Sequence, residues 1–103
     1  MENIKTLEQI KRPWVVAHRG YRGSYPENTL VAFEAAIGVN ADMIELDVSL
    51  TRDRIPVVIH DNTLDRTTNG SGPVSEHTLA ELKELDAGIW FSAKFSGEVT
   101  PTL

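Results

Sequence analysis

The sequence predicts an α/β fold that is organised around a strand–helix–strand unit, and three observations predict it. A short apolar run, Trp14 to Ala17, is typical of a buried strand. A second extended run reaches from Met43 to about Leu50. Between them, three apolar residues follow helical spacing: Leu30, Phe33 and Ile37. Such units usually pair their strands in parallel, with a right-handed crossover.

The helix of this unit has recognisable start and stop signals. The turn-rich segment Gly20 to Pro26 predicts a loop that separates the first strand from the helix. We expect Asn28 to cap the helix, with Glu27 also belonging mainly to its first turn. Gly38 and Asn40 are suitable residues for its end.

A β-hairpin is predicted after the second strand, because another extended run covers Ile55 to Ile59. A tight turn at Asp53-Arg54 would join the two runs, although Asp-Arg is a poorer turn pair than Asp-Gly. With that centre, Asp47 lies opposite His60, and both side chains share one face. A loop with an odd number of residues would give a different pairing.

The remainder of the chain carries turn signals and one short helix. A polar stretch covers Asp61 to Pro73. Thr78 and Glu81 have the spacing of a capping box before a short apolar helix. The closing Thr100-Pro101-Thr102 is typical of the start of another helix. We therefore expect the 103 residues to be a piece of a longer protein.

Composition and charge exclude several classes of protein. The chain is 41% hydrophobic, has no cysteine and carries a formal net charge of −5, which argues against nucleic-acid binding. It has no apolar run of membrane-spanning length, and its first residues do not have the pattern of a secretory signal. We therefore expect a cytoplasmic protein without a stable membrane anchor. The first twelve residues instead suit a short amphipathic helix, with apolar residues at Ile4, Leu7 and Ile10. The sequence does not indicate an oligomeric state.

Two carboxylates in the second strand predict a cation site. Glu45 and Asp47 are two residues apart and so point to the same face of a strand. Neighbouring carboxylates repel each other unless a cation lies between them. Oxygen ligands suit a hard ion, so the expected cofactor is a divalent metal, Mg²⁺ or Ca²⁺.

The candidate chemistry converges on one edge of the sheet, because parallel sheets bind ligands beyond the carboxyl ends of their strands. The first strand brings His18 and Arg19 to that edge. The second brings Glu45 and Asp47, and the hairpin returns His60. Two histidines can form an acid and base pair, and an arginine fork matches phosphate oxygens. This combination predicts hydrolysis of a small phosphoric ester.

The same residues fall within motifs that resemble the glycerophosphodiester phosphodiesterase family. The resemblance covers nearly all of the chain after about Val15, in the order and spacing of the family. Each motif alone is weak, but the ordered set is highly specific. The motifs are HRG (18–20), PENT (26–29), ELD (45–47), PVVIHD (56–61), LDRTTNG (64–70) and TLAELKELDAG (78–88).

The resemblance implies a TIM-like (β/α)8 barrel of about 250 residues, of which this chain would be the N-terminal part. Residues 12–61 would form the first strand–helix–strand unit and the hairpin. Residues 62–103 would form the small inserted segment of the family and the start of the next element. Arg54 departs from the family, whose members often have glycine there.

The resemblance also implies roles for individual residues in metal-dependent hydrolysis of glycerophosphodiesters to an alcohol and glycerol 3-phosphate. His18 and His60 would be the acid and base pair, and Arg19 would bind the phosphate. Glu45 and Asp47 would bind the divalent metal. The third metal carboxylate of the family and its lysine belong to a later strand that is not in this sequence.

Alternatives stay open at this point. A truncated and inactive chain could act as a binding or assembly segment, and a related phospholipase on the same barrel is a weaker possibility. Asp61 could orient His60 or simply start a turn. Arg66 is expected to form a local ion pair with Asp65, and His77 is expected to be a surface residue without a role.

Overall fold

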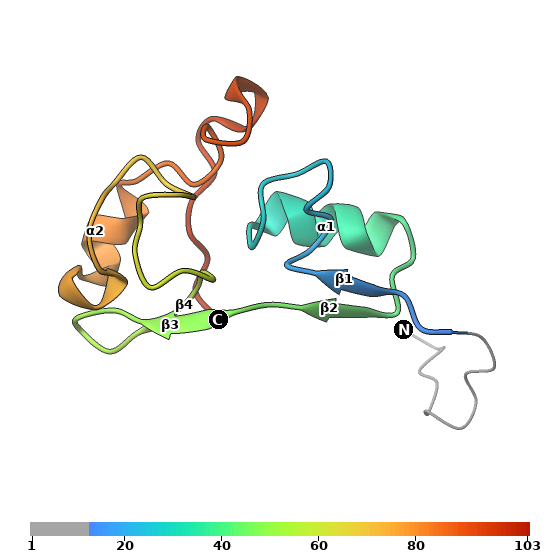
Figure 1. Ribbon diagram of the computed structural model, residues 1–103, viewed down its shortest axis with the longest axis horizontal. Coiled ribbons are helices and arrows are strands. Elements are labelled where there is room, and N and C mark those ends of the chain that lie inside the picture. Colours follow the sequence, from blue (N-terminus) through green and yellow to red (C-terminus); the bar gives the residue numbers. More distant parts are fainter. Residues whose placement is uncertain (1–12) are drawn as a thin grey trace.

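The structure is a computed structural model that describes residues 13–103. The helix expected around Ile4, Leu7 and Ile10 lies outside the described residues. The elements in chain order are β1 (Val16–His18), α1 (Leu30–Gly38), β2 (Met43–Glu45), β3 (Val48–Leu50), β4 (Pro56–Val58), η2 (Val74–Glu76), α2 (Leu79–Lys83) and η3 (Ala93–Phe95). The strands form two separate two-stranded sheets, and no barrel closes within residues 13–103 (Figure 1).

The first sheet confirms the strand–helix–strand unit. Strands β1 and β2 are parallel, with His18 opposite Glu45 in the register. Helix α1 connects them and lies along one side of the pair (Figure 1). Because both strands run in the same direction, their carboxyl ends meet at one edge, as expected.

Helix α1 differs from the prediction at its cap. Thr29 is the N-cap, and its hydroxyl oxygen accepts a hydrogen bond from the backbone N–H of Ala32 at 3.3 Å. Asn28 does not cap the helix, because its φ of 55° places it in the left-handed region before the cap. Its side chain is therefore available for a contact elsewhere.

The buried face of α1 also differs from the prediction. Ala32 and Ala36 are fully buried, whereas Leu30 and Ile37 are 61% and 66% exposed. The chain at Gly20 lies so close to the helix that a Cβ there would come within 2.9 Å of the Ala32 Cβ. Small side chains are needed at this contact, so the helix turns its alanines inward and its larger residues outward.

The extended segment from Met43 to Leu50 is interrupted, contrary to the prediction of one strand. Strand β2 ends at Glu45 and β3 begins at Val48, and the two strands belong to different sheets. Strand β1 is also exposed, contrary to the prediction of a buried strand, since Val16 is 51% exposed. The interruption allows one continuous stretch of chain to connect the two sheets (Figure 1).

The predicted hairpin forms, but its register is wrong by one residue. Val48 lies opposite Val58, and the backbone N–H of Ile59 donates to the carbonyl oxygen of Asp47 at 3.0 Å. Asp47 is thus opposite Ile59 and not opposite His60. The physical reason is the turn: Arg54 has a φ of 66°, and Thr51 bonds Ile55 across it at 3.1 Å. This is a three-residue hairpin loop whose last residue is left-handed, which explains why glycine would suit position 54.

The second half of the chain packs around an aliphatic core. Its buried members are Val57, Ile59, Leu64, Val74 and Leu82. Helix α2 has the predicted capping box: the Thr78 hydroxyl accepts from the Glu81 N–H, and the Glu81 carboxylate accepts from the Thr78 N–H at 2.8 Å. This region therefore has a hydrophobic centre of its own.

The end of the chain is not the start of a helix, contrary to the prediction. Thr102 forms an antiparallel bridge with Val57, and the Val58 N–H donates to the carbonyl oxygen of Pro101 at 2.8 Å. Pairing with β4 keeps this segment extended. None of the helices within residues 13–103 combines the length and apolar character needed to cross a bilayer.

Candidate active site

Strand β1 delivers His18 and Arg19 to the edge where β1 and β2 end. The backbone N–H of Arg19 donates to the carbonyl oxygen of Glu45 at 2.8 Å, which continues the parallel ladder by one bond. Arg19 then takes a φ of 60° and Gly20 a φ of 80°, so the chain turns sharply away. His18 remains accessible, with its Nε2 atom 3.6 Å from Glu45 Oε1.

The Arg19 guanidinium lies deeper in the site and is shared between carboxylates. Its side chain is only 14% exposed. The Nε atom lies 3.5 Å from Asp47 Oδ2, and Nη1 lies 3.3 Å from Glu27 Oε2. These contacts are longer than the usual 2.7–2.9 Å of a charge-assisted hydrogen bond. Arg19 is therefore held in place without its donors being tightly engaged.

Asn28 supports the second carboxylate. Its Nδ2 atom donates to Asp47 Oδ2 at 3.0 Å, and Asn28 is 4% exposed. The left-handed backbone at Asn28 aims the amide at Asp47 instead of at the helix. Its Oδ1 atom is buried without a hydrogen-bond partner in the described part of the chain.

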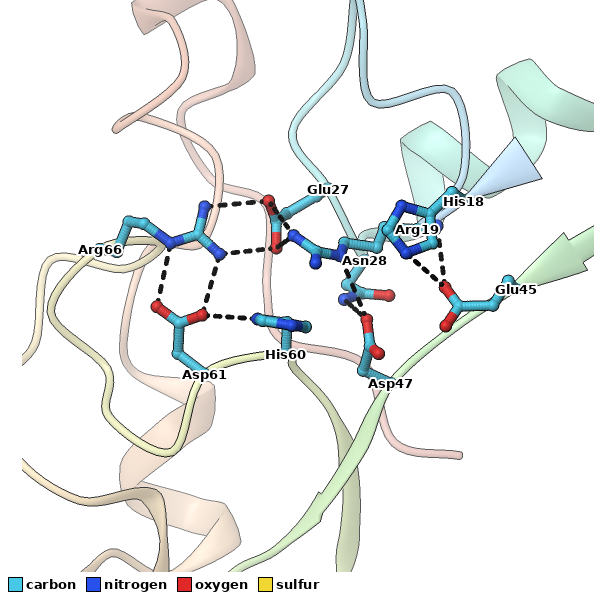
Figure 2. A network of polar contacts seen from close by, with 9 residues as sticks. All are labelled: His18, Arg19, Glu27, Asn28, Glu45, Asp47, His60, Asp61 and Arg66. Carbon is cyan, nitrogen blue, oxygen red and sulfur yellow. Dashed lines mark hydrogen bonds and ion pairs between the residues drawn. The ribbon is translucent and has the colours of Figure 1, made fainter. Parts of the chain in front are cut away.

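The oxygens at this edge fit a hard divalent cation in kind, but only as part of a ligand set. Glu45 and Asp47 project toward the same side from the end of β2 (Figure 2). The unpartnered Oδ1 of Asn28 lies beside Asp47. A hard cation takes six or more oxygens, and residues 13–103 contain no group of three or more His, Asp or Glu side chains placed to hold one.

His60 follows β4 and is bound to its neighbour in the sequence. Its Nδ1 atom lies 2.7 Å from Asp61 Oδ1. Arg66 in turn donates to Asp61 through Nε at 2.9 Å and through Nη2 at 3.0 Å. Hydrogen bonds from Arg66 and then from His60 hold the pKa of the Asp61 carboxyl well below its usual range.

Glu27 connects the two halves of the site. Both of its oxygens accept from Arg66, at 3.0 Å each, and its side chain is 7% exposed. Hydrogen bonds to Asp61 and then to Glu27 raise the pKa of Arg66 above its ordinary value. The predicted pairing of Arg66 with Asp65 is thus wrong, and Asp65 instead accepts from the N–H of Gly72 at 3.0 Å.

The structure brings the predicted residues together in one network of polar contacts, although the hairpin register that led to His60 is wrong. Figure 2 shows His60 and Asp47 directed toward the same row of side chains, formed by Glu27, Arg19 and Asn28. Neither Asp47 nor His60 lies within a strand, so strict alternation does not apply to them. Asp61 contacts His60 at 2.7 Å, which is the contact that the role of orienting His60 requires.

Sequence reasoning missed three members of the network: Glu27, Asn28 and Arg66. The sequence places Glu27 and Asn28 at the helix start, because asparagine is a common cap residue before an apolar helical pattern. Pro26 to Thr29 is buried throughout, which is unusual for the polar residues of an exposed helix start. The signal for Arg66 is its place in the LDRTTNG motif, but its partners are 39 and 5 residues away along the chain.

An α/β unit that presents two imidazoles, an arginine and paired carboxylates at its strand ends is the arrangement expected of a metal-dependent phosphoric ester hydrolase. Comparison with protein families makes this specific. The model of the glycerophosphoryl diester phosphodiesterase family matches residues 18–103. The chain belongs to this family.

Curated relatives agree with the family assignment. The chain is 60% identical over 89 residues to a glycerophosphodiester phosphodiesterase of Caldanaerobacter subterraneus, covering 86% of this chain and 37% of the relative. It is 50% identical over 86 residues to one from Bacillus subtilis, covering 84% of this chain and 29% of the relative. The chain thus spans about a third of the length of these relatives.

Solved structures agree as well. A glycerophosphodiester phosphodiesterase of Agrobacterium tumefaciens superposes with a TM-score of 0.87 at 48% identity, covering 89% of this chain and 40% of that one. A phosphodiesterase of Oleispira antarctica, solved with the product sn-glycerol-3-phosphate, gives a TM-score of 0.86 at 47% identity, covering 88% and 37%. Structures of this family are TIM barrels, and the present chain corresponds to about 40% of one.

Proposed function

We propose that this chain supplies the histidine pair, the phosphate-binding arginine and two metal ligands of an enzyme that hydrolyses glycerophosphodiesters to an alcohol and glycerol 3-phosphate. The observation that carries the proposal is the meeting of His18, Arg19, Glu45, Asp47 and His60 around one polar network. The Oleispira relative was solved with the matching product, sn-glycerol-3-phosphate.

His18 and His60 would exchange protons with the substrate. One imidazole takes a proton from the attacking nucleophile, which is water or a neighbouring glycerol hydroxyl that water later displaces, and the other gives a proton to the leaving alcohol. His60 is bound through Nδ1 to Asp61, which leaves Nε2 as its reactive nitrogen. His18 is 48% exposed at the open side of the edge, where a substrate can reach it.

Arg19 would bind a phosphoryl oxygen and stabilise the charge that builds up there. Its guanidinium is largely shielded from water, which strengthens its interaction with a negative charge. Its contacts with Glu27 and Asp47 are long, so its donors can still bind a phosphoryl oxygen. Glu45 and Asp47 would hold the divalent cation, with further ligands from residues beyond the described chain, from water or from the substrate. When bound, the cation polarises the phosphoryl group.

The test places this chain in a complete barrel. The matching 89 residues of the Caldanaerobacter relative would be replaced by the corresponding residues of this chain. We expect the hybrid to release glycerol 3-phosphate from glycerophosphocholine, to lose this activity in EDTA and to regain it with Mg²⁺ or Ca²⁺. A folded hybrid without activity at any metal concentration would contradict the proposal.

The 103-residue chain assayed alone gives the matching control. We expect it to be inactive, because the carboxylates present are too few to hold the cation. Its exposed apolar residues at the first sheet, among them Val15, Val16 and Met43, favour the alternative of a segment that assembles with other protein. Activity of the chain alone at the level of the hybrid would rule that alternative out.

A further inference from the structure

We propose that Arg66 is a positioning residue that acts through two carboxylates. Through Asp61 it fixes the tautomer of His60, and through Glu27 it keeps the donors of Arg19 available for a phosphate. The inference rests on the proposed function, because it assigns a purpose to the arrangement around those two residues. Arg66 belongs to the segment after β4, and its hydrogen bonds go to Asp61 and Glu27 and not to His60 or Arg19. Its effect on both is carried by Asp61 and by Glu27 (Figure 2).

The first carboxylate is Asp61. Arg66 contacts both of its oxygens, through Nε and through Nη2, so the carboxylate plane is fixed against the guanidinium plane. The oxygen that Nη2 reaches, Oδ1, is the same oxygen that lies 2.7 Å from His60 Nδ1. A carboxylate held in this way accepts a hydrogen bond from the Nδ1–H group and leaves the Nε2 lone pair of His60 free for the site.

The second carboxylate is Glu27. Arg66 occupies both of its oxygens at 3.0 Å, whereas Arg19 lies at 3.3 and 3.4 Å from the same two atoms. Arg66 is therefore the stronger partner of Glu27. In its absence Glu27 would turn fully to Arg19 and compete with a phosphate for the donors of that guanidinium.

Arg66 is fixed from a further direction. Its guanidinium carbon lies 6.0 Å from the centre of the Trp90 ring, within range of a cation–π contact. Trp90 is itself anchored, since its Nε1 donates to the carbonyl oxygen of Ala87 at 3.0 Å. Two carboxylates and the Trp90 ring thus contact the guanidinium and define its position, although the Arg66 side chain is 45% exposed.

The experiment measures the tautomer of His60 in the 103-residue chain by long-range ¹H–¹⁵N NMR at about pH 8, above the ordinary pKa of histidine. The sequence contains three histidines, and His77 serves as an internal reference. Its Nδ1 lies 2.7 Å from the carbonyl oxygen of Pro73, which can only accept, so His77 must carry its proton on Nδ1. We expect His60 to show the same Nδ1–H signature.

The decisive variant is Arg66→Lys, which keeps the positive charge but removes the planar guanidinium that can bind both oxygens of a carboxylate. We expect His60 to lose its Nδ1–H signature and become a mixture of tautomers, while His77 is unchanged. Arg52→Lys is the matched control, because the exposed Arg52 side chain lies outside the network and contacts Glu81 at 3.6 Å. It should leave His60 unchanged. A His60 signature that survives Arg66→Lys overturns the proposal.

If Arg66→Lys prevents folding, as judged by loss of the His77 signature, Glu27→Gln replaces it. This variant leaves Arg66 in place but removes one of the oxygens that hold it. A partial loss of the His60 signature supports the proposal, and an unchanged signature overturns it. None of these measurements needs enzyme activity, so an inactive hybrid would contradict the proposed function and leave this result standing.

Discussion

The two halves of the described chain differ in how they bury their apolar residues. In residues 48–103, aliphatic side chains meet in one core, and Leu64, Val74 and Leu82 are fully buried. In residues 13–47, the fully buried apolar side chains are the small ones of Pro26, Ala32 and Ala36. Larger residues there stay at the surface, with Ile37 66% exposed.

The same contrast is seen in the surface of the first half. An open hollow of about 370 Å³ lies beside β1 and is lined by Val15, Val16, Ala17 and Val39 among others. His18 also lines this hollow, whereas Arg19, Glu27 and Asp47 lie in the polar network through which this half meets residues 48–103 (Figure 2). Residues 13–47 thus carry most of the predicted site residues, and residues 48–103 provide the aliphatic core beside them.

The largest expected effect concerns the chemistry. In the hybrid barrel, His18→Ala or His60→Ala should each lower kcat by about 10²- to 10⁴-fold, since each removes a group that transfers a proton. The matched control is His77→Ala, because His77 bonds the Pro73 carbonyl and lies outside the network. Glycerol 3-phosphate release measures the effect. A loss confined to His18→Ala would mean that His60 does not belong to the site.

The next effect concerns the core. Leu82→Ala in the 103-residue chain should lower the free energy of unfolding by about 2–5 kcal/mol, because the side chain is fully buried. Ile37→Ala removes a similar side chain from the exposed surface of α1 and should change it by about 0.5 kcal/mol or less. Urea unfolding followed by circular dichroism compares the two. Equal costs would show that the halves are packed alike.

A smaller effect concerns the cap of α2. Thr78→Ala removes the hydroxyl of the capping box and should cost about 1 kcal/mol of unfolding free energy. The same urea titration measures it. Thr78→Ser keeps a hydroxyl and serves as the control. A cost for Thr78→Ser equal to that of Thr78→Ala would show that the hydroxyl contributes nothing.

The smallest effect is a pH dependence in the second half. Asp86 accepts from the N–H groups of Gly88, Gly97 and Ile89, and these bonds lower its pKa from 3.8 to about 2. A lowered pKa in the folded state contributes stability above pH 4 that is lost as the pH falls toward 2. Asp86→Asn should therefore be less stable than the unmodified chain at pH 7, as measured by thermal unfolding.

The comparison for Asp86 is made again at low pH. The difference in thermal stability between the two chains should shrink between pH 4 and pH 2, because the aspartic acid becomes protonated and loses its advantage over asparagine. A difference that stays constant across this range would mean that the charge of Asp86 is not what stabilises the loop.

Local sequence patterns predicted those parts of the fold that depend on neighbouring residues. The parallel pairing of β1 with β2 and the capping box at Thr78 were both predicted correctly. The hairpin register was not, because it depends on whether Arg54 adopts a left-handed backbone, a conformation that its residue type disfavours. The outward face of α1 was missed for a similar reason, since a close approach of Gly20 selects the alanines.

The site was predicted through its motifs more than through its geometry. His18 and Glu45 follow directly from the parallel pair, whereas the argument that led from Asp47 to His60 used the wrong register. Glu27 and Arg66 were missed because long-range ion pairs leave no periodic pattern in a sequence. Charge pairing across 39 residues becomes visible only when the two segments are placed side by side.

The central claim is that residues from β1, β2 and the end of β4 form one phosphate site. A crystal structure of the hybrid barrel with Mg²⁺ and glycerol 3-phosphate measures this directly. We expect the phosphate on Arg19, the cation between Glu45 and Asp47, and both imidazoles within about 3 Å of phosphate or ester oxygens. A phosphate bound away from Arg19, or an imidazole of His60 that points away from it, would contradict the account.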